Sequence, residues 1–283
     1  MSRIFSFPAP AKLNLFLHIT GQRSNGYHNL QTLFQFLDYG DTLHFEVTNG
    51  QTVELLTEFD GVAIEDNLIY RAAKKLQTYS GVSQGVKISI DKILPMGGGL
   101  GGGSSNAATV LIALNTLWKL DLDKQTLADI GLELGADVPI FVHGYASFAE
   151  GVGEIITPQS PVEHWYLVTK PAVSISTAQV FGAEDLTRNT PLIDKSNYHL
   201  EQCHNDCQDW VINHYPEVAN LIAWLIEYAP SQMTGTGACV FSSFATEQEA
   251  RYIQSKLPSG IESFVAKGAN ISPLQHAIEK LSF

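Results

Sequence analysis

A glycine-rich segment between a strand pattern and a helix pattern constrains the fold of this chain more than any other feature. Residues 95–105 read PMGGGLGGGSS. Before them, residues 86–90 alternate apolar and polar side chains with the period of a half-buried strand. After them, residues 107–120 form an apolar, Ala- and Leu-rich run of helical length, for which Ser104 or Ser105 is a suitable N-cap. The sequence predicts a strand, a glycine loop and a helix in direct succession.

This succession is typical of an anion-binding site. The first backbone N–H groups of a helix have no intrahelical acceptor, and the helix dipole adds partial positive charge there. Glycine adopts positive φ readily and lacks the Cβ atom that would keep a ligand away. A flexible linker is the alternative, but linkers are rarely followed at once by a capped apolar helix. We interpret the segment as a phosphate cradle.

Two known phosphate-binding motifs fit this cradle poorly. The P-loop requires a lysine within the motif, and the segment contains none. The dinucleotide fingerprint G-x-G-x-x-G does match from Gly97, with acidic residues Asp121 and Asp123 near the expected distance. Those acids lie between two expected helices, whereas the fingerprint places its acid at the end of a second strand. A nucleotide-dependent oxidoreductase is therefore a weak rival interpretation.

Composition excludes several classes of protein. A chain of 283 residues with 45% hydrophobic and 16% charged residues is typical of a globular protein with one large or two medium domains. The net charge of −12 opposes binding to nucleic acid or to anionic membranes, so we expect neither partner. The apolar runs are too short to span a membrane, and the N-terminal residues lack a targeting pattern. Three cysteines are too few for a disulfide framework, so we expect free thiols in a reducing cytoplasm.

Several polar residues are candidates for chemistry. Lys12 and Asn14 share one face of an alternating strand over residues 12–19, where a solvated strand face is the simplest interpretation. Tyr27 and His28 follow a Ser-Asn-Gly turn, at a loop exit where they could stack on and hydrogen-bond a planar ligand or serve only as packing anchors.

Asp137 lies in the segment Leu-Gly-Ala-Asp-Val-Pro. The proline biases Val138 away from helix, which predicts a short fixed connection around Asp137. Its apolar neighbours indicate that the carboxylate is either partly desolvated or caps the next turn.

The remaining patterns predict an α+β protein without internal repeats. Residues 32–37 and 42–47 are expected to be two strands joined by a turn at 38–41. A helix is expected over 67–79, and a second glycine motif covers 233–239. The Pro- and Ser-containing segment near residue 157 is a suitable domain boundary. Other elements are expected as helices around 127–134, 218–226 and 247–256 and as strands at 165–168 and 263–266.

Four collinear segments together resemble the GHMP kinases, a family of small-molecule kinases that includes galactokinase, homoserine kinase and mevalonate kinase. They are residues 10–15, 95–105, 134–139 and 234–238. The additional segments 25–30 and 148–153 make the chain most similar to the members that act on an alcohol carrying a cytidine diphosphate group, in the non-mevalonate route to isoprenoids. The resemblance covers most of the chain.

The resemblance implies a two-domain fold. Residues 1–157 would form an ATP-binding domain like the second domain of ribosomal protein S5, and residues 158–283 a ferredoxin-like domain, with the active site in the cleft between them. An S5-like module that binds RNA is an alternative interpretation of the chain. The net charge of −12 disfavours it, because RNA-binding proteins carry basic surfaces.

The resemblance also implies ATP-dependent phosphorylation of the substrate's tertiary 2-hydroxyl, with release of ADP. Asp137 would accept the proton of the hydroxyl, and Lys12 would orient Asp137 and neutralise charge near the γ-phosphate. Contacts to ATP would come from Pro95, Met96, Gly97, Gly98, Gly99, Leu100, Gly101, Gly102, Gly103, Ser104 and Ser105. Mg²⁺ would accompany ATP, either with Ser104 or Ser105 as a candidate ligand or held largely by the phosphates and water, so its protein ligands are left unassigned.

Substrate contacts follow from the same resemblance. Asn14 would hydrogen-bond near the reacting hydroxyl, and Thr177 would be a weaker contact. Tyr27 and Phe181 would sandwich a cytosine ring whose polar edge His28 reads. The second glycine motif would close over the substrate diphosphate or shape the floor of the cleft. A family member acting on a smaller alcohol, such as homoserine, is a rival that would not need the aromatic residues.

Overall fold

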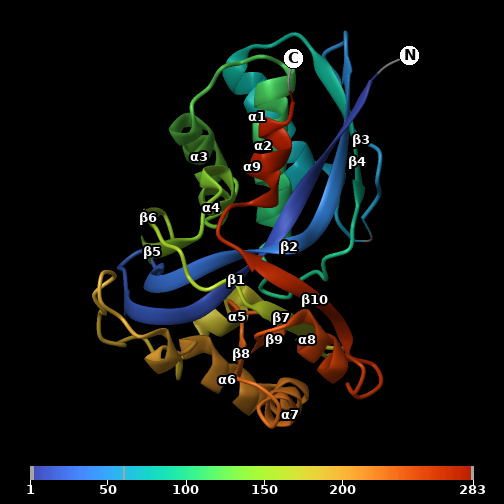
Figure 1. The fold of residues 1–283 in the computed structure, drawn as a ribbon. Coiled ribbons are helices and arrows are strands. Elements are labelled where there is room, and N and C mark those ends of the chain that lie inside the picture. Colours follow the sequence, from blue (N-terminus) through green and yellow to red (C-terminus); the bar gives the residue numbers. More distant parts are fainter. Residues whose placement is uncertain (1–2, 60, 282–283) are drawn as a thin grey trace.

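A long hairpin of two strands runs through both halves of the molecule (Figure 1). It is formed by β1 (Ile4–Gln22) and β2 (His28–Thr48). The computed structural model describes residues 3–59 and 61–281. The other strands are β3 (Val53–Leu55), β4 (Gly85–Asp91), β5 (Ser147–Gly151), β6 (Ile155–Pro158), β7 (Trp165–Lys170), β8 (Ser231–Met233), β9 (Val240–Phe244) and β10 (Glu262–Ala269). The mixture of strands and helices confirms the α+β class.

The hairpin supports a different set of strands in each half. The second part of β2 pairs with β4, and β4 pairs with β3. The first part of β2 pairs with β5, which continues into β6. In the middle of β2, Leu37 and Phe36 pair with β10, and the sheet then continues through β7 and β9 to β8. The hairpin therefore joins two packing units through a single hydrogen-bonded sheet.

Helices cover the sheet in two groups. In the upper half of Figure 1 these are α1 (Leu68–Ser80), α2 (Gly102–Leu117), α3 (Lys124–Leu132), α4 (Val138–His143) and α9 (Pro273–Glu279). The lower half contains α5 (Thr177–Gly182), α6 (Asp206–His214), α7 (Pro216–Leu225) and α8 (Glu247–Gln254). Two short 3-10 helices cover Ile64–Asp66 and Leu200–Gln202. No helix in residues 3–59 and 61–281 is both long and apolar enough to cross a membrane.

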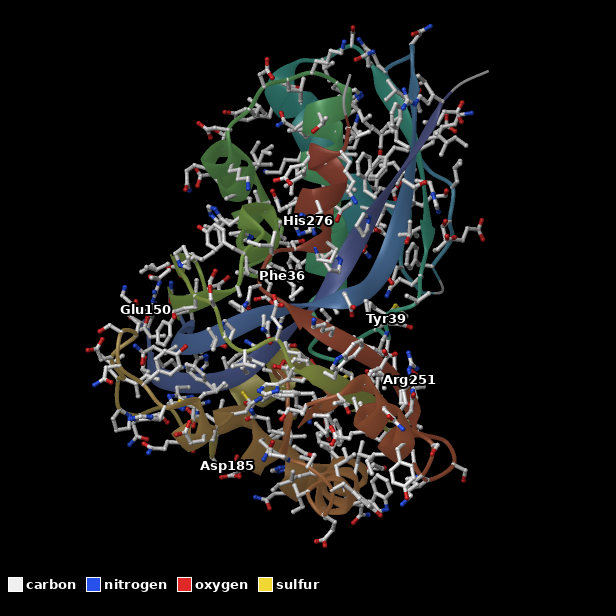
Figure 2. The ribbon with its side chains drawn as sticks, viewed as in Figure 1. Phe36, Tyr39, Glu150, Asp185, Arg251 and His276 are labelled. Carbon is white, nitrogen blue, oxygen red and sulfur yellow. The ribbon has the colours of Figure 1, made fainter. Side chains whose placement is uncertain are left out.

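The end of the chain returns to the half in which it began. His276 of α9 lies in the upper half of Figure 2, whereas Arg251 of α8 lies in the lower half. Leu274 is buried in the same core cluster as Phe45, Leu76 and residues of α2. The expected boundary near residue 157 coincides with the end of β6, and the division into domains 1–157 and 158–283 stays a prediction.

The expected turn at residues 38–41 is wrong, because β2 continues through it without interruption. Gly40 pairs with Pro10 of β1, and a Cβ atom at Gly40 would lie 2.2 Å from the carbonyl oxygen of Ala9. Asp41 is fully buried and accepts the N–H groups of Ile93 and Leu94, each at 2.8 Å. Glycine and aspartate are turn-forming residues, but here one permits close strand contact and the other anchors the start of the glycine loop.

The close contact at Gly40 gives a stability prediction. In Gly40→Ala the added methyl group meets backbone atoms of β1, so we expect the free energy of unfolding to fall by about 3 kcal/mol. Gly50→Ala is the matched control, since nothing lies within 4 Å of its Cβ position, and its effect is expected to stay within about 0.5 kcal/mol. Urea unfolding of both variants measures the difference, and equal stability would show that β1 and β2 are not in close contact here.

Candidate active site

The glycine loop leads directly into α2 through three residues with positive φ. Gly97, Gly99 and Gly101 have φ of 67°, 78° and 71°. α2 begins at Gly102, and its N-cap is Gly101, which makes no side-chain capping bond. The helix therefore begins five positions before residue 107, and its first N–H groups belong to the glycine tract itself.

The prediction of Ser104 or Ser105 as the N-cap is wrong. The carbonyl of Gly101 accepts the N–H of Ser105 at 2.8 Å, so both serines already lie in the first turn. A left-handed glycine can enter the helix without a side-chain cap, a conformation that the sequence pattern does not specify. The Ser105 hydroxyl donates to the carbonyl of Pro10 at 2.7 Å and is fully buried. Ser105 therefore anchors α2 to β1 and does not line the cleft.

The second glycine motif supports the first glycine loop from beneath. A Cβ atom at Gly99 would lie 2.2 Å from the carbonyl oxygen of Thr234, and one at Gly237 would lie 2.3 Å from the carbonyl carbon of Gly98. The N–H of Cys239 donates to the carbonyl of Gly98 at 3.3 Å. Of the two expectations for this motif, the geometry favours a role in the floor of the cleft.

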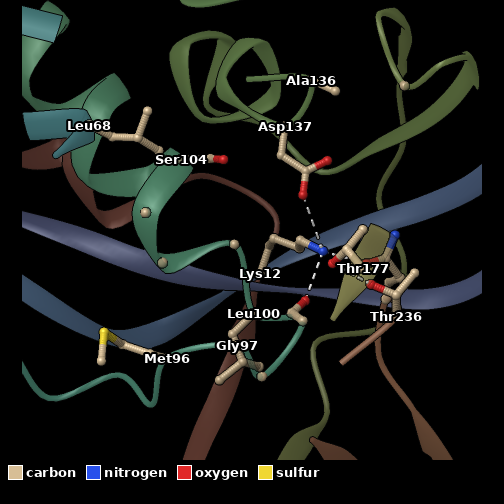
Figure 3. A pocket seen from close by; sticks show the side chains of 18 of the residues that line it. Lys12, Leu68, Met96, Gly97, Leu100, Ser104, Ala136, Asp137, Thr177 and Thr236 are labelled. Carbon is tan, nitrogen blue, oxygen red and sulfur yellow. Dashed lines mark hydrogen bonds and ion pairs between the residues drawn. The ribbon is translucent and has the colours of Figure 1, made fainter. Parts of the chain in front are cut away.

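Lys12 connects the loop to the opposite wall of the cleft (Figure 3). Its ammonium donates to the carbonyl of Gly99 at 2.9 Å and to the amide oxygen of Asn14, and it lies 3.6 Å from the carboxylate of Asp137. Lys12 is 2% exposed and Asn14 is 4% exposed, so a solvated strand face is excluded. Burial lowers the pKa of the Lys12 ammonium, and the nearby carboxylate of Asp137 opposes that shift.

Asp137 precedes α4 but does not cap it. The side chain makes no capping hydrogen bond, and 37% of it is exposed. The expectation that Val138 avoids helix is wrong, since Val138 begins α4 with Pro139 in its first turn. Proline is tolerated there because it lacks a backbone N–H group, and the N–H groups of the first turn make no intrahelical hydrogen bond in any helix. The Asp137 carboxylate is therefore not used in capping α4, and it lines the cleft beside Lys12.

The cleft has a volume of about 990 Å³ and is lined by both halves of the molecule. It contains all the predicted site residues except Ser105: Lys12, Asn14, Tyr27, His28, Pro95–Ser104, Asp137, Thr177 and Phe181. This volume lies at the upper end of the usual range for ligand-binding clefts. The structure thus brings together predicted site residues that are separated by up to about 170 positions in the sequence, from Lys12 to Phe181.

One end of the cleft was missed by sequence reasoning. Beyond the glycine loop it is lined by Phe59, Val62 and Leu68, together with Asn67 and Lys92. Asn67 is the N-cap of α1 and accepts the N–H of Ile69 at 2.9 Å. The sequence offered only a helix start at this position, and nothing in that pattern indicates a ligand.

The other end of the cleft carries the aromatic residues. Tyr27 is 61% exposed at the rim. His28 stacks on Phe181 with ring centroids 5.0 Å apart and an interplanar angle of 23°. Nε of Arg188, which sequence reasoning also missed, donates to Nε2 of His28 at 3.0 Å. The hydroxyl of Thr177 is 2.8 Å from that of Thr236, which links α5 to the second glycine motif.

Metal ligands and thiols complete the inventory of reactive groups. In the part of the chain that the structure describes, no three His, Cys, Asp or Glu side chains converge to hold a metal ion. The expectation of free thiols is confirmed for Cys203, Cys207 and Cys239. Burial raises the pKa of Cys207 and of Cys239 to about 12, so both stay protonated.

The support of the loop by the second motif can be tested by a double-mutant cycle. A Cβ atom at Gly98 would lie 2.5 Å from Sγ of Cys239, while its next neighbours are 3.7 Å away. We expect Gly98→Ala to destabilise the protein by about 2 kcal/mol, and much of that loss to disappear when Cys239→Ala removes the sulfur. Urea unfolding of the two single variants and the double variant measures the coupling energy. Strictly additive losses would contradict this contact.

Comparisons with known proteins agree with this geometry. The family model for the GHMP kinases N-terminal domain matches residues 67–145, and the model for the GHMP kinases C-terminal region matches residues 194–262. The chain is 59% identical to the 4-diphosphocytidyl-2-C-methyl-D-erythritol kinase of Colwellia psychrerythraea, over 100% of this chain and 96% of that protein. It is 57% identical to the enzyme of the same name from Pseudoalteromonas atlantica, over 97% of this chain and 96% of that protein.

Solved structures show the same architecture. A crystal structure of 4-(cytidine 5'-diphospho)-2C-methyl-D-erythritol kinase matches with a TM-score of 0.83 and 29% identity, over 94% of this chain and 99% of that chain. Homoserine kinase from Cytophaga hutchinsonii matches with a TM-score of 0.73 and 15% identity, over 96% of each chain, which shows a shared fold alone. The chain belongs to the GHMP kinase family.

Proposed function

We propose that this chain is an ATP-dependent kinase that phosphorylates the tertiary 2-hydroxyl of 4-diphosphocytidyl-2-C-methyl-D-erythritol, with release of ADP, in the non-mevalonate route to isoprenoids. One observation carries the proposal: a glycine loop at a helix N-terminus and a carboxylate share one cleft, with a single buried lysine between them. The names of the relatives, at 57% and 59% identity over nearly the whole chain, support the substrate.

ATP would bind with its phosphates on the glycine loop and the first turn of α2. The N–H groups there and the helix dipole attract the phosphates despite the overall negative charge of the chain. The adenine ring would occupy the apolar end of the cleft between Phe59, Val62 and Leu68. In this arrangement the terminal phosphate would lie toward Lys12 and Asp137.

Asp137 would accept the proton of the attacking hydroxyl. Phosphoryl transfer requires positioning and charge stabilisation more than covalent chemistry, and the pair of Lys12 and Asp137 supplies both. The ammonium of Lys12 faces the carboxylate at 3.6 Å and donates to the carbonyl of Gly99. The carboxylate favours the charged form of Lys12 against the burial that lowers its pKa.

Asn14 would act mainly through Lys12. Its amide oxygen accepts the ammonium of Lys12, and its amide nitrogen donates to the hydroxyl of Thr32 at 2.9 Å. One amide hydrogen is left for the substrate. Asn14 therefore holds the lysine in place and offers at most one donor near the reacting hydroxyl.

Mg²⁺ would reach the site bound to ATP. Mg²⁺ keeps several waters and is held by one or two protein oxygens plus substrate phosphates, so the lack of a dedicated cage among the described residues fits this mode. The Ser104 hydroxyl and the Asp137 carboxylate are two of the oxygen groups that line the cleft. The ion would neutralise charge on the phosphates.

The cytosine ring would bind at the aromatic end. The exposed ring of Tyr27 can stack on one face of the base, and His28 can hydrogen-bond its edge. Phe181 already stacks on His28, so it supports the histidine ring as well as facing the cleft.

An ADP-release assay tests the function directly. We expect turnover with 4-diphosphocytidyl-2-C-methyl-D-erythritol and none with homoserine or mevalonate. In Asp137→Asn, loss of the base is expected to lower kcat by about 10³-fold while changing KM for both substrates less than about threefold. Asp129→Asn, on the exposed face of α3, is the matched control. Turnover of homoserine instead would reject the proposed substrate. A near-normal kcat in Asp137→Asn would reject Asp137 as the base.

Removing the ring of Tyr27 tests the base-binding end. In Tyr27→Ala we expect KM for the cytidine substrate to rise about fivefold, because a stacked ring pair contributes about 1 kcal/mol. KM for ATP should stay within about twofold. Tyr79→Ala is the control, since Tyr79 is 59% exposed on α1 and does not line this cleft. Equal increases in KM for both substrates would reject the stacking role.

A further inference from the structure

The loop after α5 holds a guanidinium against the edge of His28. Nε of Arg188 donates to Nε2 of His28 at 3.0 Å. Nη1 donates to the backbone carbonyls of Leu186 at 3.0 Å and Glu184 at 3.4 Å. Nη2 donates to the backbone carbonyl of Phe181 at 3.1 Å and to that of Ala183. The contacts use every N–H direction of the guanidinium and leave it no freedom to turn.

This contact decides which nitrogen of His28 carries the proton. Arginine stays protonated and has no acceptor atom, so Nε2 of His28 must present its lone pair. The proton of the neutral ring is then on Nδ1. An unconstrained imidazole in water prefers the opposite tautomer, so Arg188 imposes a state that His28 would not otherwise favour.

Among the described residues, the nitrogen that carries the imposed proton has no hydrogen-bond partner. His28 lines the cleft, and its ring plane is fixed by the stack on Phe181. Within residues 3–59 and 61–281 no protein group hydrogen-bonds Nδ1 of His28, whereas Nε2 is occupied. His28 therefore offers one N–H donor to a ligand and no acceptor.

We propose that Arg188 is a positioning residue that fixes His28 as the Nδ1–H tautomer, and that this donor selects cytosine over uracil in the substrate. Atom N3 of cytosine accepts a hydrogen bond, so it can pair with the Nδ1–H group. In uracil N3–H is itself a donor, so it cannot form a hydrogen bond with the Nδ1–H group. The inference rests on the proposed cytidine diphosphate substrate, and it adds a residue that sets the choice of base.

The charges around His28 support a neutral ring. Burial and, second, the charge of Arg188 lower the pKa of His28 below its ordinary value near 6.5. The other charged residues on adjoining segments are Arg23 and Glu154, paired at 3.7 Å, and Glu184 and Asp185 beside Arg188. Of these groups only Arg188 shifts the pKa of His28. In Arg188→Ala the pKa is expected to rise toward its ordinary value.

Nitrogen-15 NMR of the ligand-free protein tests the tautomer without any substrate. We expect the His28 signals at pH 7.5 to show a protonated Nδ1 and an unprotonated Nε2, and Arg188→Ala to shift the population toward Nε2–H. A wild-type ring protonated on Nε2 would overturn the inference and leave the proposed function untouched. Failure of ADP release with the cytidine substrate would instead reject the proposed function, whichever tautomer is found.

Kinetics test the selection of the base. For wild type and Arg188→Ala, kcat/KM is measured with the cytidine substrate and with its uridine analogue. We expect the cytidine-to-uridine ratio to fall about tenfold in Arg188→Ala, because Nδ1 of the Nε2–H tautomer accepts from uracil N3–H. KM for ATP should not change. An unchanged ratio would contradict the proposal.

The pH profile separates this role from loss of loop structure. Imidazolium carries protons on both nitrogens, so kcat/KM of Arg188→Ala for the cytidine substrate should recover relative to wild type as the pH falls through about 6.5. His28→Asn provides a second check, because an amide donates whether or not Arg188 is present. In that background Arg188→Ala should cause little further loss. An equal loss in both backgrounds, with no recovery at low pH, would assign Arg188 a purely structural role.

Discussion

The fold and the site both depend on one buried positive charge. An ammonium removed from water is costly unless it is paired and hydrogen-bonded, and Lys12 is 2% exposed. Its partners come from three distant parts of the chain: Asn14 on the same strand, Gly99 in the glycine loop and Asp137 before α4. The charge is tolerated only when β1, the loop and α4 are assembled, so correct folding and a competent site require the same contacts.

The second constraint is the contact between two glycine-rich segments. At Gly99 and Gly237 the two backbones approach so closely that a Cβ atom on either would lie within 2.3 Å of the other segment. At Gly99 the first glycine loop therefore rests on main chain from the other half of the molecule. A loop supported in this way keeps its N–H groups oriented before a ligand arrives, which lowers the cost of ordering it on binding.

Sequence reasoning failed where a residue type has two uses. Gly40 and Asp41 match a turn, yet Gly40 permits close strand contact and Asp41 is a buried acceptor for the start of the glycine loop. The serines at 104 and 105 match an N-cap, yet a left-handed Gly101 lets the helix begin before them. In each case the local preference is real, but the backbone conformation or contacts around the residue decide the outcome.

The sequence by itself determined the elements around the glycine loop, the family resemblance and the candidate residues that the cleft brings together, because periodicity and short motifs are local properties. The strands at 86–90 and 165–168 and the helix at 67–79 are found within a few residues of their expected limits. Only the tertiary structure decided that Lys12 is buried against Asp137, that the second glycine motif lies beneath the first, and that Arg188 fixes the ring of His28. These contacts join residues separated by 125, about 138 and 160 positions, and no local pattern records which distant backbone a side chain will meet.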